Sequence, residues 1–127
     1  MISLKKNIMT TQQIATRLAE LCRQGKFEDA QKELYAKDVV SIEPEATPAF
    51  EKETKGAEKN LEKVRKFDGM VEEMHSIQVS EPIISGNSFA MKMDMDLTMK
   101  GRKRETMGEL CVYHVKDGKV ISEQFFM

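Results

Sequence analysis

The sequence has few of the residues that build metal sites, and it carries almost no net charge. Its two cysteines, Cys22 and Cys111, and its two histidines, His75 and His114, do not show the close spacing of metal sites. We therefore expect no metal and no cofactor. Lysine and arginine total 20 against 21 for aspartate and glutamate, a formal net charge of -1. Such a balance argues against nucleic acids and anionic membranes as partners.

Long apolar segments are also missing. No run of about 18 apolar residues could span a membrane, and the N-terminal MISLKKNIMTT lacks the apolar core of a signal peptide after Lys5 and Lys6. These absences indicate a soluble, cytoplasmic protein with reduced thiols. A chain of 127 residues has the size of one ordinary domain. We expect a loose tail over residues 1–9 and a single domain over residues 10–127.

Helical periodicity marks the first half of the chain. Thr10 and Gln13 have the spacing of a capping box, and the apolar pattern that follows predicts an amphipathic helix over residues 11–24, which ends at Gly25. The segment KFEDAQKELY predicts a second helix over residues 27–35, and KGAEKNLEKVRKF predicts a third over residues 56–67. Between them, the β-branched DVVSIEP is typical of a short strand.

After Met70 the hydrophobic period changes to two. Four alternating segments follow, separated by the turn sequences SGN, KGR and KDG. This pattern predicts four antiparallel strands after residue 70. Helices followed by such a set of strands are typical of an α+β domain in which the helices pack on one face of a sheet.

Methionine occupies alternate positions in FAMKMDMDLTMK, at Met91, Met93 and Met95. The charged residues between them are typical of a solvated sheet face, so the methionines should face the helices. The preceding strand should place three residues on the same inner face: His75, Ile77 and Val79. Two interpretations stay open, because flexible thioethers fill irregular core space and also form adaptable walls around ligands.

The last hairpin decides which polar residues share the inner face. Its Asp-Gly turn favours a two-residue loop, which predicts these inward pairs: Tyr113 with Ser122, Cys111 with Gln124 and Glu109 with Phe126. The outer face would then carry His114, Glu123 and an apolar patch larger than a monomer usually exposes. That patch comprises Leu110, Val112, Ile121 and Phe125. We expect a homodimer through it.

Three segments resemble the nuclear transport factor 2-like superfamily, in particular its SnoaL-like branch: ELCRQGKFEDAQKELYAKDVVSIEP, KGAEKNLEKV and VYHVKDGKVISEQFF. The resemblance covers about residues 11–127 and lies in the order of the elements. It implies a cone-shaped α+β fold of the cystatin-like type, with a strongly bent antiparallel sheet wrapped over three N-terminal helices. It also implies a cavity at the wide end and dimers through the outer sheet face. The superfamily includes polyketide cyclases, ketosteroid isomerase, dehydratases and proteins without known catalysis.

The resemblance to ketosteroid isomerase can be followed residue by residue. The general base of that enzyme is an acidic residue just before a proline, and Glu43 before Pro44 matches that position. Its oxyanion hole uses a tyrosine and a protonated aspartate, which correspond to Leu18 and Cys111 here. The resemblance therefore implies a candidate base without the two oxyanion donors.

The polar residues expected inside the cone form the candidate site. A carboxylate there must be hydrogen-bonded, raised in pKa or open to water, so Glu109 is the best candidate for an acid or base, followed by Glu43 and His75. The expected ligand-binding residues are Tyr113, Gln124, Cys111, Ser122, Met91, Met93, Met95 and Phe126. In the alternative interpretation, Glu109 and Gln124 bond to Tyr113 and to backbone, and serve only to tie strand to helix.

Two functions fit these expectations. The first is a cavity protein for a small hydrophobic carbonyl compound, which would transfer a proton with Glu109 or Glu43 as an isomerase, a cyclase or a dehydratase does. The second is a non-catalytic, dimeric binding or scaffold module whose interior is filled by the methionines.

Overall fold

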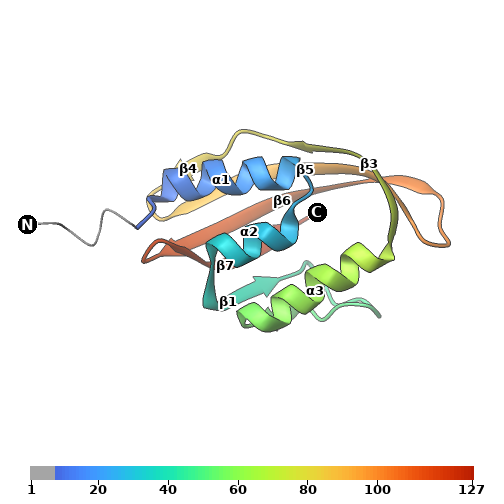
Figure 1. Ribbon diagram of the computed structural model, residues 1–127, viewed down its shortest axis with the longest axis horizontal. Helices are drawn as coiled ribbons and strands as arrows, with labels where there is room; N and C mark the ends of the chain where they lie inside the picture. The colour runs from blue at the N-terminus through green and yellow to red at the C-terminus, as the bar shows by residue number, and fades with distance from the viewer. Residues whose placement is uncertain (1–7) are drawn as a thin grey trace, which may run out of the picture.

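The computed structural model describes residues 8–127, in which three helices cover one side of a curved, unclosed sheet (Figure 1). The helices are α1 (Thr11–Arg23), α2 (Phe27–Leu34) and α3 (Ala57–Met70). The strands are β1 (Tyr35–Ile42), β2 (Glu53–Lys55), β3 (Val71–Val79), β4 (Ile83–Ser85), β5 (Ser88–Met99), β6 (Arg104–Lys116) and β7 (Lys119–Phe126). The predicted α+β class, with its three helices before the strand-rich half, is confirmed.

The start and end of α1 follow the chemistry that the sequence predicts. The Thr10 hydroxyl accepts a hydrogen bond from the Gln13 amide at 3.1 Å, and the Gln13 side chain accepts one from the Thr10 amide at 2.9 Å. Gly25 follows the helix with a φ of 72°, in the left-handed region that favours glycine. Met9 packs against the core, so the predicted loose tail does not reach that residue, and its first seven positions lie outside the described residues.

The strand order in the sheet is β2-β1-β7-β6-β5-β3, and β4 pairs with β5. β1 runs parallel to β7, whereas the other pairs are antiparallel. The first strand predicted after Met70 is divided into β3 and β4 around Pro82, because proline cannot donate to a strand ladder. Within the described residues, no helix is both long and apolar enough to span a membrane.

The methionines of β5 face the helices, as the alternation predicts. Met91, Met93 and Met95 are 1%, 6% and 6% exposed, while Lys92 between them is exposed. The β5–β6 hairpin pairs Met93 directly with Glu109. On the other side of β5, β3 places Ile77 and Val79 opposite the methionines, which confirms this part of the inner face.

The predicted inner and outer faces of β7 are exchanged. The register between β6 and β7 shifts because Ile121 is an extra residue in β7, between the pairs Val115 with Val120 and His114 with Ser122. Such a bulge turns every later side chain to the opposite face. Glu123 is therefore only 4% exposed, and Phe125 packs against the core. The residues that were wrongly predicted to face inward are Ser122, Gln124 and Phe126.

A second bulge moves His75 away from the predicted site. The register between β3 and β5 shifts between Met74 and Ser76. The His75 Nε2 atom lies 2.8 Å from Thr98 Oγ1, and Nδ1 lies 2.7 Å from a carboxylate oxygen of Glu73. The residues on either side of Thr98 in β5, Leu97 and Met99, are buried and face inward, so the Thr98 side chain points to the outer face. The predicted inward orientation of His75 is wrong.

Candidate functional site

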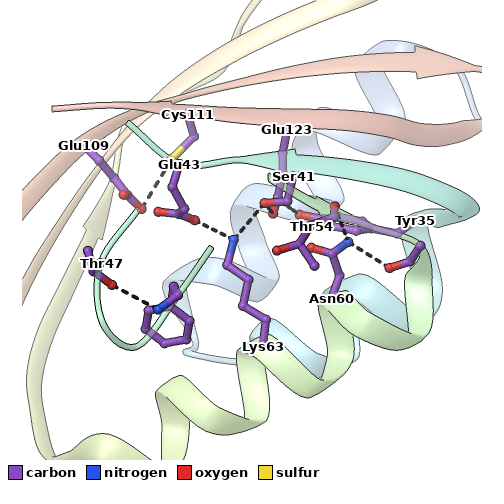
Figure 2. A network of polar contacts seen from close by, with 12 residues as sticks. Tyr35, Ser41, Glu43, Thr47, Thr54, Asn60, Lys63, Glu109, Cys111 and Glu123 are labelled. Atoms are coloured by element: carbon purple, nitrogen blue, oxygen red, sulfur yellow. Dashed lines mark hydrogen bonds and ion pairs between the residues drawn. The ribbon is translucent and has the colours of Figure 1, made fainter. Parts of the chain in front are cut away.

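Five polar side chains form a connected network where α3 crosses β1 and β7 (Figure 2). They are Tyr35 and Ser41 on β1, Glu43 just after it, Lys63 on α3 and Glu123 on β7. Strand alternation puts Ser41 on the same face as the buried Val39. The parallel register then sets Ser41 directly beside Glu123. Among residues 8–127, no cluster of histidine, cysteine and acidic side chains is arranged to hold a metal ion.

Glu123 is the buried centre of the network. The Ser41 hydroxyl donates to Glu123 Oε2 at 2.7 Å, and the Tyr35 hydroxyl donates to Oε1. Burial raises the pKa of Glu123, although the two hydrogen bonds oppose that rise. Burial raises the pKa of Tyr35 as well, and the neighbouring Glu123 charge adds to it. A neutral tyrosine hydroxyl therefore remains available to stabilise the buried carboxyl group.

Lys63 supplies the positive charge of the network. Its Nζ atom donates to Ser41 Oγ at 3.0 Å and to Glu43 Oε2 at 2.5 Å. The Lys63 side chain is 18% exposed and that of Glu43 is 24% exposed, so water screens this ion pair only in part. The ammonium also lies 5.7 Å from the centroid of the Phe125 ring, which the bulge in β7 turned inward.

Glu109 borders this network from β6, on the same side as Glu43 (Figure 2). Burial raises the pKa of Glu109 to about 7, and the charges of Glu43 and Glu123 add to the rise. A contact from the Cys111 thiol, with 3.9 Å between Sγ and Oε1, and the charge of Lys63 oppose it. A carboxyl group with a pKa near neutrality can both accept and donate a proton under ordinary conditions.

Two further predicted residues, Cys111 and Tyr113, lie inside the fold as expected. Burial and the charge of Glu109 raise the pKa of the Cys111 thiol, which keeps it protonated and weakly reactive. Burial likewise raises the pKa of Tyr113. The Tyr113 ring stacks on Phe89 with 4.8 Å between ring centroids, so it is part of the packed core.

The structure therefore gathers only some of the predicted site residues. Glu109, Glu43 and Cys111 come together, and the methionines lie in the adjoining core. Four predicted members lie on the outer face: His75, Ser122, Gln124 and Phe126. Four members were missed: Tyr35, Ser41, Lys63 and Glu123. The alternation in DVVSIEP could have identified Ser41, whereas the bulge concealed Glu123.

Two grooves reach this network from outside. One, of about 230 Å³, lies between α2 and α3 and is lined in part by Tyr35. The other, of about 310 Å³, lies between α3 and the segment that follows β1, and Phe50, Thr54 and Lys63 are among its lining residues. Neither groove is lined by Glu109 or by the methionines of β5. Among the five residues of the network, Lys63 is the one that lines the larger groove.

Comparison with known proteins shows which family the chain belongs to. The SnoaL-like domain model matches residues 9–127. A structure from Mesorhizobium loti is provisionally named a SnoaL-like polyketide cyclase, with carbohydrate phosphatase added in brackets. It is 32% identical over 94% of this chain and 100% of that one, with a TM-score of 0.86. No curated protein matches the chain.

Two more distant structures share the fold. A protein with a cystatin-like fold from Xanthomonas campestris is 17% identical, with a TM-score of 0.79 and coverage of 93% of this chain and 90% of that one. A protein with a ketosteroid isomerase-like fold from Catenulispora acidiphila is 18% identical, with a TM-score of 0.71 and coverage of 93% and 87%. Since the family model spans nearly the whole described chain, the protein belongs to the SnoaL-like domain family and has the fold of nuclear transport factor 2-like proteins.

Proposed function

We propose that this protein catalyses proton transfer on a small hydrophobic carbonyl compound, with Glu109 as the base. The observation that carries the proposal is the position of Glu109, a carboxyl group near two other glutamates and on the residue paired with the apolar Met93. This setting raises its pKa to about 7. The name polyketide cyclase, given to the Mesorhizobium loti relative, supports chemistry next to a carbonyl group.

The three carboxyl groups have different roles in this proposal. Glu43 forms an ion pair with Lys63. The two carboxylate oxygens of Glu123 accept hydrogen bonds from Tyr35 and Ser41. Glu109 has only a long thiol contact within the described residues, so its oxygens are the ones available to a substrate. The ionised form would remove a proton from the carbon beside a carbonyl group, and the protonated form would return it to another atom.

Exchange of substrate protons with deuterated water tests this proposal. Small ketones and diketones that raise the melting temperature would be followed by proton NMR for loss of signal at the carbon beside the carbonyl group. We expect kcat/KM for exchange to rise with pH through about 7 and then level off, because Glu109 must be ionised. Glu109→Gln should lower it by about 100-fold or more.

The matched control for the exchange experiment is Glu72→Gln, which neutralises an exposed glutamate on β3. This variant should exchange substrate protons as the wild type does. Exchange that is unchanged in Glu109→Gln would contradict the assignment of the base.

A non-catalytic binding or scaffold module is the second candidate function. The burial of Met91, Met93 and Met95 favours it, because side chains so completely packed act as core rather than as a ligand wall. A module of this kind would bind a partner or a ligand but would give no exchange at any pH. The same NMR experiment therefore separates the two functions.

We also propose a homodimer through the outer face of β6 and β7. Leu110 and Phe126 lie opposite each other on this face and are 44% and 46% exposed, which leaves an apolar surface for a second copy. Phe126 replaces Phe125 in the predicted patch, because Phe125 points inward, while Val112 keeps its place.

The dimer has a simple test. Leu110→Lys should convert the dimer to a monomer in light scattering, because the charge would be buried at the centre of the interface. Thr106→Lys, farther along the same face of β6, should leave the mass unchanged. A dimer mass retained by Leu110→Lys would place the interface elsewhere.

A further inference from the structure

Removing a proton beside a carbonyl group creates negative charge on the carbonyl oxygen, and an enzyme needs a donor placed to meet it. The two positions that correspond to the oxyanion donors of ketosteroid isomerase hold Leu18 and Cys111. Leu18 is 1% exposed in the core, and a thiol such as that of Cys111 is a weak donor. A site that uses Glu109 as base must therefore take its donor from another element.

We propose that Lys63 is this donor, and that the substrates are carbonyl compounds whose oxygen binds its ammonium as they pass through an enolate; this inference rests on the proposed proton transfer. An ammonium group has three N–H donors. Two of them are used by Glu43 and Ser41, and within residues 8–127 the third has no hydrogen-bond partner. Lys63 also lines the larger groove, so the substrate oxygen can reach it from outside.

The neighbouring lysines of α3 do not offer the same arrangement. Lys59 is exposed to solvent, where water screens its charge. Lys66 is exposed as well, and its Nζ atom already donates to the Ala49 carbonyl at 2.5 Å and lies 5.3 Å from the centroid of the Phe50 ring. Lys63 alone among these three is sheltered, and it is close enough to Glu109 to lower the pKa of that carboxyl group. Its charge therefore acts on the carboxyl group that would remove the proton.

The proposed step is balanced without an oxidant or a metal. The proton leaves carbon for the Glu109 carboxylate, and the electrons of the broken C–H bond form a carbon–carbon double bond. The π electrons of the carbonyl group move to its oxygen, which accepts the hydrogen bond from Lys63. When the substrate carries a carbon–carbon double bond next to the carbon that loses the proton, the intermediate is a dienolate. The proton then returns from Glu109 to the far carbon of that double bond, the double bond shifts, the carbonyl group re-forms, and Lys63 keeps its own proton throughout.

Binding of para-nitrophenol tests Lys63 without any catalytic readout. Its phenolate mimics an enolate, and its visible absorbance reports whether the bound molecule is ionised. At about pH 6, where Glu109 carries its proton, the wild type should bind the phenolate and lower the apparent pKa of the phenol. Lys63→Met should bind the phenolate about tenfold or more weakly, because a charge-assisted hydrogen bond is lost, and should abolish the shift.

Two further variants keep this test decisive. Lys63→Arg retains the charge and should retain most of the phenolate binding, which a merely structural loss in Lys63→Met would not explain. Lys116→Met removes the same charge from an exposed position on β6 that lines neither groove, and it should bind as the wild type does. The proposal is overturned if the wild type does not bind the phenolate, or if Lys63→Met binds it equally well. Exchange that still depends on Glu109 would then leave the proposed function standing without this donor.

Discussion

Replacing Glu123 with alanine should lower the free energy of unfolding by about 3 to 5 kcal/mol. The carboxyl group accepts hydrogen bonds from Tyr35 and Ser41 in a position that is 4% exposed. Without it, both hydroxyl groups lose their partner in a place where water cannot fully replace it, and the missing side chain leaves a void beside the core. Urea denaturation of the variant and the wild type measures the difference directly.

Glu123→Gln is the matched control for this prediction. Glutamine keeps the volume and one carbonyl oxygen as an acceptor, and it removes the cost of burying a charge. We expect this variant to lose less than about half of the stability that alanine loses. Equal losses in the two variants would show that the second acceptor oxygen, rather than the packing that glutamine keeps, makes Glu123 important. A negligible loss in Glu123→Ala would contradict the buried position itself.

As the pH rises, the free energy of unfolding of the wild type should fall by about 3 kcal/mol because of Glu109 alone, and Glu109→Gln should lack this part of the fall. The pKa of Glu109 rises from 4.5 to about 7 on folding. Below about pH 4.5 the group is protonated in both the folded and the unfolded chain, so its contribution to stability is complete. Between about pH 4.5 and pH 7 the unfolded chain releases this proton whereas the folded chain keeps it. The free energy of unfolding of the wild type therefore falls as the pH rises through this range. Above about pH 7 the loss is complete.

The measurement compares urea denaturation of the wild type and the variant at a series of pH values. Glutamine does not titrate, so the difference between the two curves isolates Glu109 from the other acidic residues. The exposed Glu72→Gln should give a curve parallel to that of the wild type. A difference that grows at high pH in favour of the wild type would mean that folding lowers the pKa of Glu109 instead.

The alternation of charge and methionine in β5 was enough to predict its faces from the sequence. Turning that strand over would bury Lys92, Asp94 and Asp96 without partners, at a cost of several kcal/mol per ion. The strand β7 gave no such signal, because VISEQFF has apolar residues on both faces whichever register is chosen. A bulge at Ile121 therefore costs little in apolar burial, and the local pattern does not reveal it.

The polar network was harder to predict because its members meet only through tertiary structure. Lys63 reaches Glu43 and Ser41 across separations of 20 and 22 residues, and the contact depends on how α3 crosses β1. Burying Glu123 looks unfavourable until Tyr35 and Ser41 are seen beside it. Periodicity predicts which face a residue occupies, but it does not tell which partners arrive from other elements.

The parallel pairing of β1 with β7 has a consequence for the order of events in folding. Ser41 and Glu123 are separated by 82 residues, so closing this contact requires a long loop to be ordered first. During synthesis on the ribosome, β1 and β6 each have an unpaired edge until β7, the last strand, has emerged. Such unpaired edges can form hydrogen bonds with strands of other chains. Rapid synthesis and high expression should therefore favour aggregation of chains that have not yet inserted β7.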